Sequence, residues 1–204
     1  MTIQPNSGAW SYRCDKLLRD GTLVTVRSIR PEDNQLLARH FELLSPDSRY
    51  RRFFGLRHAI EPHELDRLTA PEYPKHIALI AVVTDAAGAP LIIGDARCVA
   101  TDQPGEAELA MSVLDKYQGL GVGSLLVRHL SRCAQQAGFQ RLTTDTLASN
   151  APALRMLVRG GFTSVARSDG ICTFVHALTP DTTAALADSL GYASGVGFLS
   201  PSRS

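Results

Sequence analysis

A glycine-rich stretch in the middle of the chain has the composition of a phosphate-binding loop. Residues 117–124 read YQGLGVGS, after an apolar, strand-like run at 107–114 and before a helix-like run at 125–137. Glycines between a strand and a helix let backbone N–H groups face an anion without Cβ atoms in the way, and the helix dipole favours phosphate there. No Lys follows Gly123, and the G-x-G-x-x-G pattern of dinucleotide sites is absent. Taken alone, these residues would equally make an ordinary strand-to-helix turn.

A glutamate in the preceding apolar strand is the candidate for acid–base chemistry. Strand alternation places Glu106, Glu108 and Ala110 on one face. A carboxylate inside a central apolar strand is costly unless it is paired or functional. Glu108 could take a proton from an amine in a water-poor cleft, or it could form an ion pair with Arg97 on the neighbouring strand. Glu106, next to a turn, is expected to be a solvated edge charge.

The composition indicates an ordinary soluble globular protein. Of the 204 residues, 44% are hydrophobic and 20% charged, and the formal net charge is +1. This balance gives no argument for a nucleic-acid or membrane partner, and neither a transmembrane run nor a signal peptide is evident. The six histidines show no metal spacing, so no metal is expected. The cysteines are scattered without a C-x-x-C pair, which predicts a reduced, cytoplasmic protein; they are Cys14, Cys98, Cys133 and Cys172.

Apolar periodicity and turn residues divide the chain into elements. Strands are predicted at 23–30, 77–84, 91–100, 107–114, 142–147, 165–167 and 171–178. Helices are predicted after 31–33 and at 49–54, 62–69, 122–137 and 150–159. Residues 1–19 are expected to be an N-terminal arm, weakly structured over 1–15, and 20–178 the folded domain. Residues 179–204 form a C-terminal extension with helix potential at 181–190. This order predicts an α+β mixed sheet.

Two motifs in the expected order identify a family resemblance. The pattern Gln118-x-x-Gly121-x-Gly123 is similar to the acyl-CoA pyrophosphate loop of the GNAT superfamily of N-acetyltransferases. One strand downstream, residues 150–162 resemble the N-x-x-A-x-x-L-Y-x-x-x-G-F segment of that superfamily. The matching positions are Asn150, Ala153, Gly161 and Phe162. The resemblance implies a central mixed, mostly antiparallel twisted sheet flanked by helices and splayed between the fourth and fifth strands.

The opening of the domain narrows the resemblance. Residues 26–33 and 44–54 are similar to the start of the acetyltransferase domain of bacterial Pat-type protein lysine acetyltransferases. Those domains carry an A-E-F-A-like strand before the loop, and residues 106–113 stand in that place. The similarity covers roughly residues 20–178. It implies an acetyl-CoA-dependent N-acetyltransferase that acts on a primary amine, either a protein lysine or a small amine, by direct attack.

The resemblance also assigns roles to residues. Glu108 is the general base, and Met111 and Val113 give backbone hydrogen bonds to the pantetheine where their strand splays from 142–147. Asn150 binds the pantetheine, acts as a helix N-cap, or does both. The pyrophosphate is assigned to the loop residues Gln118, Gly119, Gly121, Val122, Gly123 and Ser124.

One position departs from the family pattern. Many members have a tyrosine acid where this chain has Leu157, so the substrate amine or a water must protonate the leaving thiolate. Tyr117 suits packing against the loop, and Tyr192 could serve only if the tail folds over the cleft. The basic run 49–52 is expected to lie in a short amphipathic helix beside the acceptor cleft. A catalytically silent acyl-CoA-binding module remains the alternative function, and a homodimer remains open.

Overall fold

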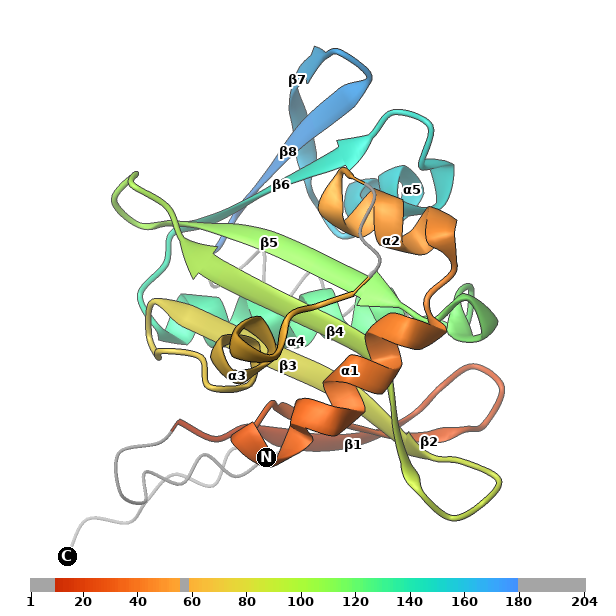
Figure 1. The fold of residues 1–204 in the computed structure, drawn as a ribbon. Coiled ribbons are helices and arrows are strands. Elements are labelled where there is room, and N and C mark those ends of the chain that lie inside the picture. The colour runs from red at the N-terminus through yellow and green to blue at the C-terminus, as the bar shows by residue number, and fades with distance from the viewer. Residues whose placement is uncertain (1–9, 56–58, 180–204) are drawn as a thin grey trace, which may run out of the picture.

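The computed structural model describes residues 10–55 and 59–179 as one open eight-stranded sheet with helices on both faces (Figure 1). The strands are β1 (Arg13–Leu17), β2 (Leu23–Ser28), β3 (His76–Thr84), β4 (Pro90–Ala100), β5 (Glu106–Val113), β6 (Arg141–Leu147), β7 (Thr163–Ser168) and β8 (Ile171–Ala177). The helices are α1 (Asn34–Leu43), α2 (Pro46–Phe53), α3 (Pro62–Thr69), α4 (Val122–Gln136) and α5 (Ala151–Arg159), with short 3₁₀ turns η1 (Pro31–Asp33) and η2 (Asp115–Tyr117). The predicted α+β architecture is confirmed.

The sheet is mostly antiparallel, in the order β1-β2-β3-β4-β5-β6-β8-β7. The pair β5–β6 is parallel and short: it joins Glu106–Glu108 only to Arg141–Thr143. Beyond Glu108 the two strands diverge, as Figure 1 shows. The splay predicted between the fourth and fifth expected strands is therefore confirmed, and it leaves one edge of β5 without a partner strand over residues 109–113.

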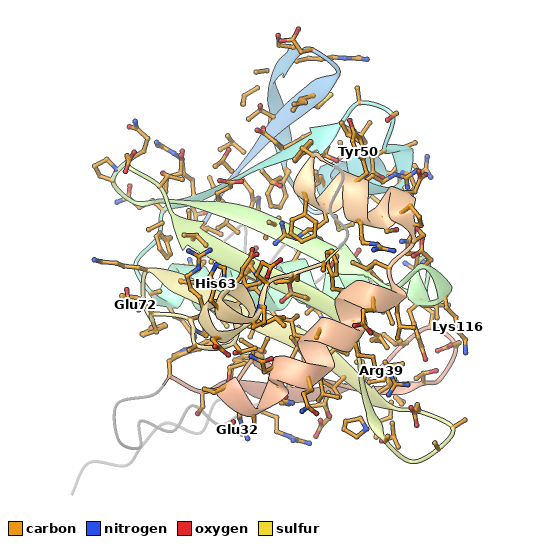
Figure 2. All side chains as sticks on the ribbon, in the orientation of Figure 1. Glu32, Arg39, Tyr50, His63, Glu72 and Lys116 are labelled. Atoms are coloured by element: carbon orange, nitrogen blue, oxygen red, sulfur yellow. The ribbon has the colours of Figure 1, made fainter. Side chains whose placement is uncertain are left out.

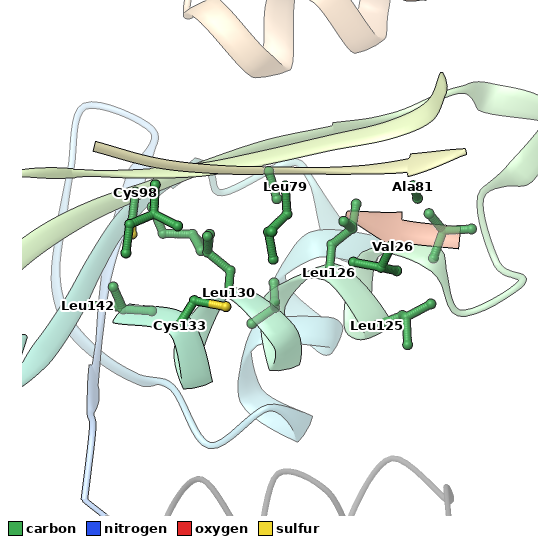
Figure 3. Close-up of a cluster of buried hydrophobic side chains, with 14 of the residues drawn as sticks. Val26, Leu79, Ala81, Cys98, Leu125, Leu126, Leu130, Cys133 and Leu142 are labelled. Atoms are coloured by element: carbon green, nitrogen blue, oxygen red, sulfur yellow. The ribbon is translucent and has the colours of Figure 1, made fainter. Parts of the chain in front are cut away.

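Helix α4 covers one face of the sheet and packs on β3, β4 and β5. Its fully buried Leu125, Leu126 and Leu130 meet β-strand side chains in the main core (Figure 3). At Gly94 in β4 a Cβ would lie 2.8 Å from Leu126 Cδ1, so glycine is what lets the helix approach this closely. The long helix predicted at 122–137 and the C′ glycine Gly138 are confirmed.

The opposite face is covered by α1, α2 and α3. Arg39 on α1, Tyr50 on α2 and His63 on α3 mark these helices in Figure 2. Ser45 caps α2 by accepting a hydrogen bond from the Ser48 backbone N–H at 3.1 Å, so the helix begins at Pro46 rather than at residue 49. A second core cluster lies here, formed by Ile29, Leu37, Leu65, Ala78, Ile80 and Ile92. Helices α1 and α2 thus cover part of β4 and β5, whereas Val99 and Glu108 on the same two strands remain exposed.

The prediction of weak structure over residues 1–15 is wrong for residues 13–15, because they belong to β1, which pairs with β2 throughout. Their side chains are exposed or half-buried, so no apolar alternation marks them. An edge strand of this kind is held by its backbone ladder. The division at residue 19 stays a prediction, and the helix expected at 181–190 lies outside the described residues. Within residues 10–55 and 59–179, no helix has the length and apolar character to cross a membrane.

Candidate active site

The glycine loop connects η2 to α4 and leaves the first turn of the helix open to a ligand. Gly121 is the N-cap residue with φ +96°, a left-handed conformation that favours glycine. Its carbonyl accepts the first helical hydrogen bond, from the Leu125 N–H at 2.9 Å. The N–H groups of the three residues between them, 122–124, therefore have no acceptor within the helix. These groups and the helix dipole make an anion site of the predicted kind.

The Gln118 side chain is used within the protein. Its Nε2 donates to Ser48 Oγ at 3.2 Å and to the Val113 carbonyl at 3.1 Å. Its amide therefore joins α2 to the end of β5, and any bond from Gln118 to a pyrophosphate must come from its backbone or after rearrangement.

Asp115 strengthens the same connection. Its carboxylate accepts hydrogen bonds from the Ser45 N–H at 3.0 Å, from Ser45 Oγ at 2.8 Å and from Ser48 Oγ at 2.8 Å. Partial burial opposes ionisation, but these hydrogen bonds outweigh it and lower the pKa of Asp115. The N-terminus of α2 is thus fixed to the loop that leads into α4.

The free edge of β5 faces the gap left by β6. The Leu114 N–H donates to Ile93 of β4 at 3.0 Å. Because N–H directions alternate along a strand, those of Met111 and Val113 point the other way, into the gap. A Cβ on Gly123 would lie 3.0 Å from Met111 Cε and 3.7 Å from Met156 Sδ of α5. The structure therefore brings β5, the glycine loop and α5 together beside the splay between β5 and β6, and this splay is called the opening from here on.

Asn150 is the N-cap of α5, with Oδ1 accepting from the Ala153 N–H at 3.3 Å. The N-cap prediction is confirmed, and the contact with pantetheine stays a prediction. Leu157 of the same helix is 3% exposed and belongs to the main core, so it offers no group to the opening. Tyr117 is half-buried in η2 with Lys116 Nζ 5.7 Å from its ring centre. Tyr192 lies outside the described residues.

Glu108 is exposed and occupies the last position at which β5 pairs with β6. The alternative ion pair with Arg97 is wrong, because Arg97 binds Asp95 of its own strand, Nη2 to Oδ1 at 2.6 Å. Glu106 is not simply a solvated charge: the Arg141 Nε donates to it at 2.6 Å, and this hydrogen bond lowers the pKa of Glu106. Of the two glutamates, Glu108 is the one that lies at the splay.

Sequence reasoning missed a buried polar cluster on the helix-covered face. His40 of α1 is 2% exposed and contacts both the Ile92 carbonyl and Ser112 Oγ, each at 2.9 Å. The Asp95–Arg97 ion pair lies beside it, with both residues about 5% exposed or less. His40 is 52 and 72 residues from its partners Ile92 and Ser112, so no local motif could have identified these contacts. Among the described residues, no group of three or more His, Cys, Asp or Glu side chains could hold a metal ion.

Comparison with known proteins decides the family. The model of the acetyltransferase (GNAT) family matches residues 37–162, which include β5, the loop, α4 and α5. The chain belongs to this family. The resemblance inferred from the two motifs is confirmed, and with it acetyl-CoA-dependent acetyl transfer as the activity of an acyltransferase enzyme.

Two curated GNAT relatives align over most of the chain. "Acetyltransferase PA5475" of Pseudomonas aeruginosa is 31% identical over 161 residues, which are 79% of this chain and 86% of the relative. "Acetyltransferase Pat" of Mycolicibacterium smegmatis is 30% identical over 170 residues, 83% of this chain and 46% of Pat. The chain thus matches about half the length of Pat.

Solved GNAT structures agree with the fold. The GNAT domain of S. lividans PAT has a TM-score of 0.73 and 28% identity, covering 81% of this chain and 96% of that domain. YncA of Salmonella typhimurium, solved with its cofactor acetyl-CoA, has a TM-score of 0.62 and 17% identity, covering 77% and 95%. The opening described above fits such a cofactor: the free N–H groups of 122–124 suit its pyrophosphate, and the free edge of β5 suits an extended pantetheine.

Proposed function

We propose that the chain transfers the acetyl group of acetyl-CoA to a primary amine by direct attack, with Glu108 as the general base. The observation that carries this proposal is the position of Glu108. Its exposed carboxylate lies where β5 and β6 part, one strand position before the free edge that carries the N–H groups of Met111 and Val113. A base and two backbone donors therefore share one opening.

The chemistry divides among these groups. Bound acetyl-CoA supplies the activated acetyl group. A primary amine of the lysine type has a pKa of about 10.4 and must lose a proton before it attacks. Glu108 takes that proton, directly or through a water. The Met111 N–H donates to the carbonyl oxygen and stabilises the negative charge that develops on it. Leu157 cannot protonate the departing thiolate, whose pKa is about 8.5 as a free thiol, so the amine's own proton or a water serves.

The exposed setting of Glu108 favours a lysine on a protein surface as the acceptor. Glu108 pairs across the sheet with Val99, which is 44% exposed, so the surface around the carboxylate is open on the β4 side. A side chain carried on a second protein can reach such a surface, whereas a small amine is usually held in a more enclosed pocket. The free, buried thiols of Cys98 and Cys133 support the further proposal of a reducing, cytoplasmic compartment.

The test is acetyl-CoA turnover, measured as free thiol release, against a panel of lysine-containing proteins, lysine peptides and small amines including n-butylamine. We expect thiol release that depends on both acetyl-CoA and the acceptor, and acetyl-lysine in the protein product by mass spectrometry. If only small amines are acetylated, the acceptor is a small molecule and not a lysine on a protein. Tight acetyl-CoA binding without turnover on any acceptor would support the silent binding module.

The role of Glu108 is tested by Glu108→Gln, which should lower kcat by about 10²- to 10⁴-fold, the usual contribution of a positioned base. Acetyl-CoA affinity should stay unchanged. Glu106→Gln is the matched control, since it changes a carboxylate on the same strand face that is paired with Arg141. A Glu108→Gln enzyme with near-normal turnover would show that the base lies elsewhere.

A further inference from the structure

A cavity of about 240 Å³ lies on the same face of the sheet as Glu108. Its apolar wall comes from the helices and their connections, and is formed by Leu37, Phe41, Leu44, Phe53, Ile60 and Leu68. Its polar lining includes Ser112, His40 and the Asp95–Arg97 pair. The volume is sufficient for a side chain or a small organic group.

The strand β5 connects this cavity to the proposed base. Glu108, Ala110 and Ser112 alternate along β5 and therefore share a face, and their partners on β4 are Val99, Arg97 and Asp95. The small side chain of Ala110 lies between the two polar ones. Ser112 also stands between Met111 and Val113, whose N–H groups point into the splay. A group bound at Ser112 is thus next to the predicted acetyl site and on the same face of the sheet as Glu108.

The direction of the Ser112 hydrogen bond follows from the two contacts of His40. The Ile92 carbonyl can only accept, so His40 Nδ1 carries the proton and donates to it at 2.9 Å. In the neutral ring Nε2 then has no hydrogen, and it must accept from the Ser112 hydroxyl at 2.9 Å. The single proton of Ser112 is used by His40, so toward any other group Oγ can only accept, through its two lone pairs.

The same pair could in principle make Ser112 a nucleophile, since a serine hydrogen-bonded to an oriented histidine is the arrangement of covalent catalysis. The environment of His40 argues against this. Burial lowers the pKa of His40; Asp95 opposes that effect, while Arg97 and Arg52 add to it. A lowered pKa makes His40 a weaker base toward the Ser112 proton, which favours a pair that fixes the direction of the hydroxyl over one that activates it.

We infer that Ser112 positions the acceptor amine: its Oγ, held by His40, accepts a hydrogen bond from an N–H of the incoming amine. This inference rests on the proposed function and names a specificity residue for that same site. The amine must be neutral when it attacks, and an N–H donated to Ser112 leaves the nitrogen lone pair for the carbonyl carbon. His40 acts only through Ser112. An acceptor whose attacking atom carries no hydrogen gains nothing from this contact.

The test compares Ser112→Ala, Ser112→Thr and wild type, with the best amine of the panel and n-butylamine as probes at saturating acetyl-CoA. Ser112→Ala should raise KM for the amine roughly 2- to 10-fold, the range for one lost neutral hydrogen bond, with kcat little changed. The Kd for acetyl-CoA should stay as in wild type, and any fall in Tm should reflect only the buried His40 Nε2 that loses its hydrogen-bond donor. Ser112→Thr, which keeps the hydroxyl, should restore the wild-type KM.

Ser131→Ala is the matched control. Ser131 is fully buried in α4 on the other face of the sheet, and its Oγ has no hydrogen-bond partner within the described part of the chain. The KM of the Ser131→Ala enzyme for the amine should equal that of wild type. His40→Leu should raise KM like Ser112→Ala, and the double variant should be no worse than either single one. If His40→Leu does not fold, the amine KM values of the Ser112 variants still test the inference.

Three results would overturn the inference in an active enzyme. They are an unchanged amine KM in Ser112→Ala, an equal loss of acetyl-CoA affinity in that variant, and an acetylated Ser112 detected by mass spectrometry after mixing with acetyl-CoA alone. A wild-type protein that turns over no amine on the panel is a different result, because it overturns the proposed function and this inference together.

Discussion

Replacing Gly121 by alanine separates the role of the loop in binding from its role in folding. Gly121 has φ +96° and ψ 0° at the N-cap of α4. A Cβ in the left-handed region costs about 1–2 kcal/mol of stability. The variant can relieve that strain only by rotating the peptide planes that aim the N–H groups of residues 122–124. We therefore expect two losses, one in stability and one in binding.

The loss in binding can be estimated from the hydrogen bonds concerned. A hydrogen bond from a backbone N–H to a charged pyrophosphate contributes about 1.5–3 kcal/mol. If one such bond is lost, the Kd for acetyl-CoA should rise roughly 10- to 150-fold, since about 1.4 kcal/mol is tenfold. Isothermal titration calorimetry with CoA measures this, and urea denaturation measures the change in unfolding free energy.

Gly138→Ala provides the control. Gly138 follows the other end of α4 with φ +97°, and a Cβ there would have nothing within 4 Å. Its backbone strain matches that of Gly121, so its stability loss should be similar, but its CoA affinity should be that of wild type. A Gly121→Ala protein that loses stability like Gly138→Ala and still binds CoA within threefold of wild type would refute the assignment of the loop.

Three further predictions concern single positions. Because Leu157 offers no acid, the pH profile of kcat/KM should rise through one ionisation and lack a falling limb near the tyrosine pKa of about 10; a falling limb abolished by mutating Tyr117 would assign the acid to that residue. Asn150→Ala should lower the unfolding free energy by about 1 kcal/mol through loss of the N-cap. Asn150→Ser should restore the stability but not the CoA affinity. If both variants keep the wild-type CoA affinity, Asn150 does not contact the cofactor and its role is that of an N-cap alone. Burial lowers the pKa of His129 to about 3, so the unfolded chain binds a proton below about pH 6.5 that the folded chain excludes. This group alone should lower the unfolding free energy by up to about 1.4 kcal/mol per pH unit between pH 6.5 and 3. Urea denaturation at pH 7 and pH 5 should therefore show a weaker pH dependence in His129→Gln than in wild type; an equal dependence would contradict this origin.

Elements with strong local signals could be predicted from the sequence. The glycine after α4 is present in the structure, and so is the short helix predicted at 49–54, although α2 begins earlier, at Pro46. Each depends on contacts between residues that are close in the sequence, so the local residue types are enough to predict it. The edge strand β1 could not be predicted, because its ladder with β2 requires no apolar pattern.

Side-chain partners across the fold could not be predicted for a different reason. An ion pair between Arg97 and Glu108 is the alternative that facing strands allow, yet in the structure Arg97 binds Asp95 and Glu108 lies opposite Val99. The pyrophosphate contact of Gln118 stays a prediction, but the bonds of its side-chain amide to Ser48 and Val113 could not be foreseen. Alternation tells which face a residue occupies, but the register and the covering helices decide which partner it meets.

The two glutamates of β5 show how topology adds what alternation cannot. Glu106 and Glu108 share a face and lie two positions apart, so strand alternation alone cannot tell which of the two carboxylates is the base. The parallel partner β6 is still present at Glu106, where Arg141 supplies an ion pair at 2.6 Å. At Glu108 the β5–β6 pairing ends, and the carboxylate lies at the opening. A base must reach both solvent and substrate, and a carboxylate already neutralised by arginine is a poor proton acceptor. The point at which two strands separate, rather than either residue's type, is therefore what distinguishes the proposed base from its neighbour.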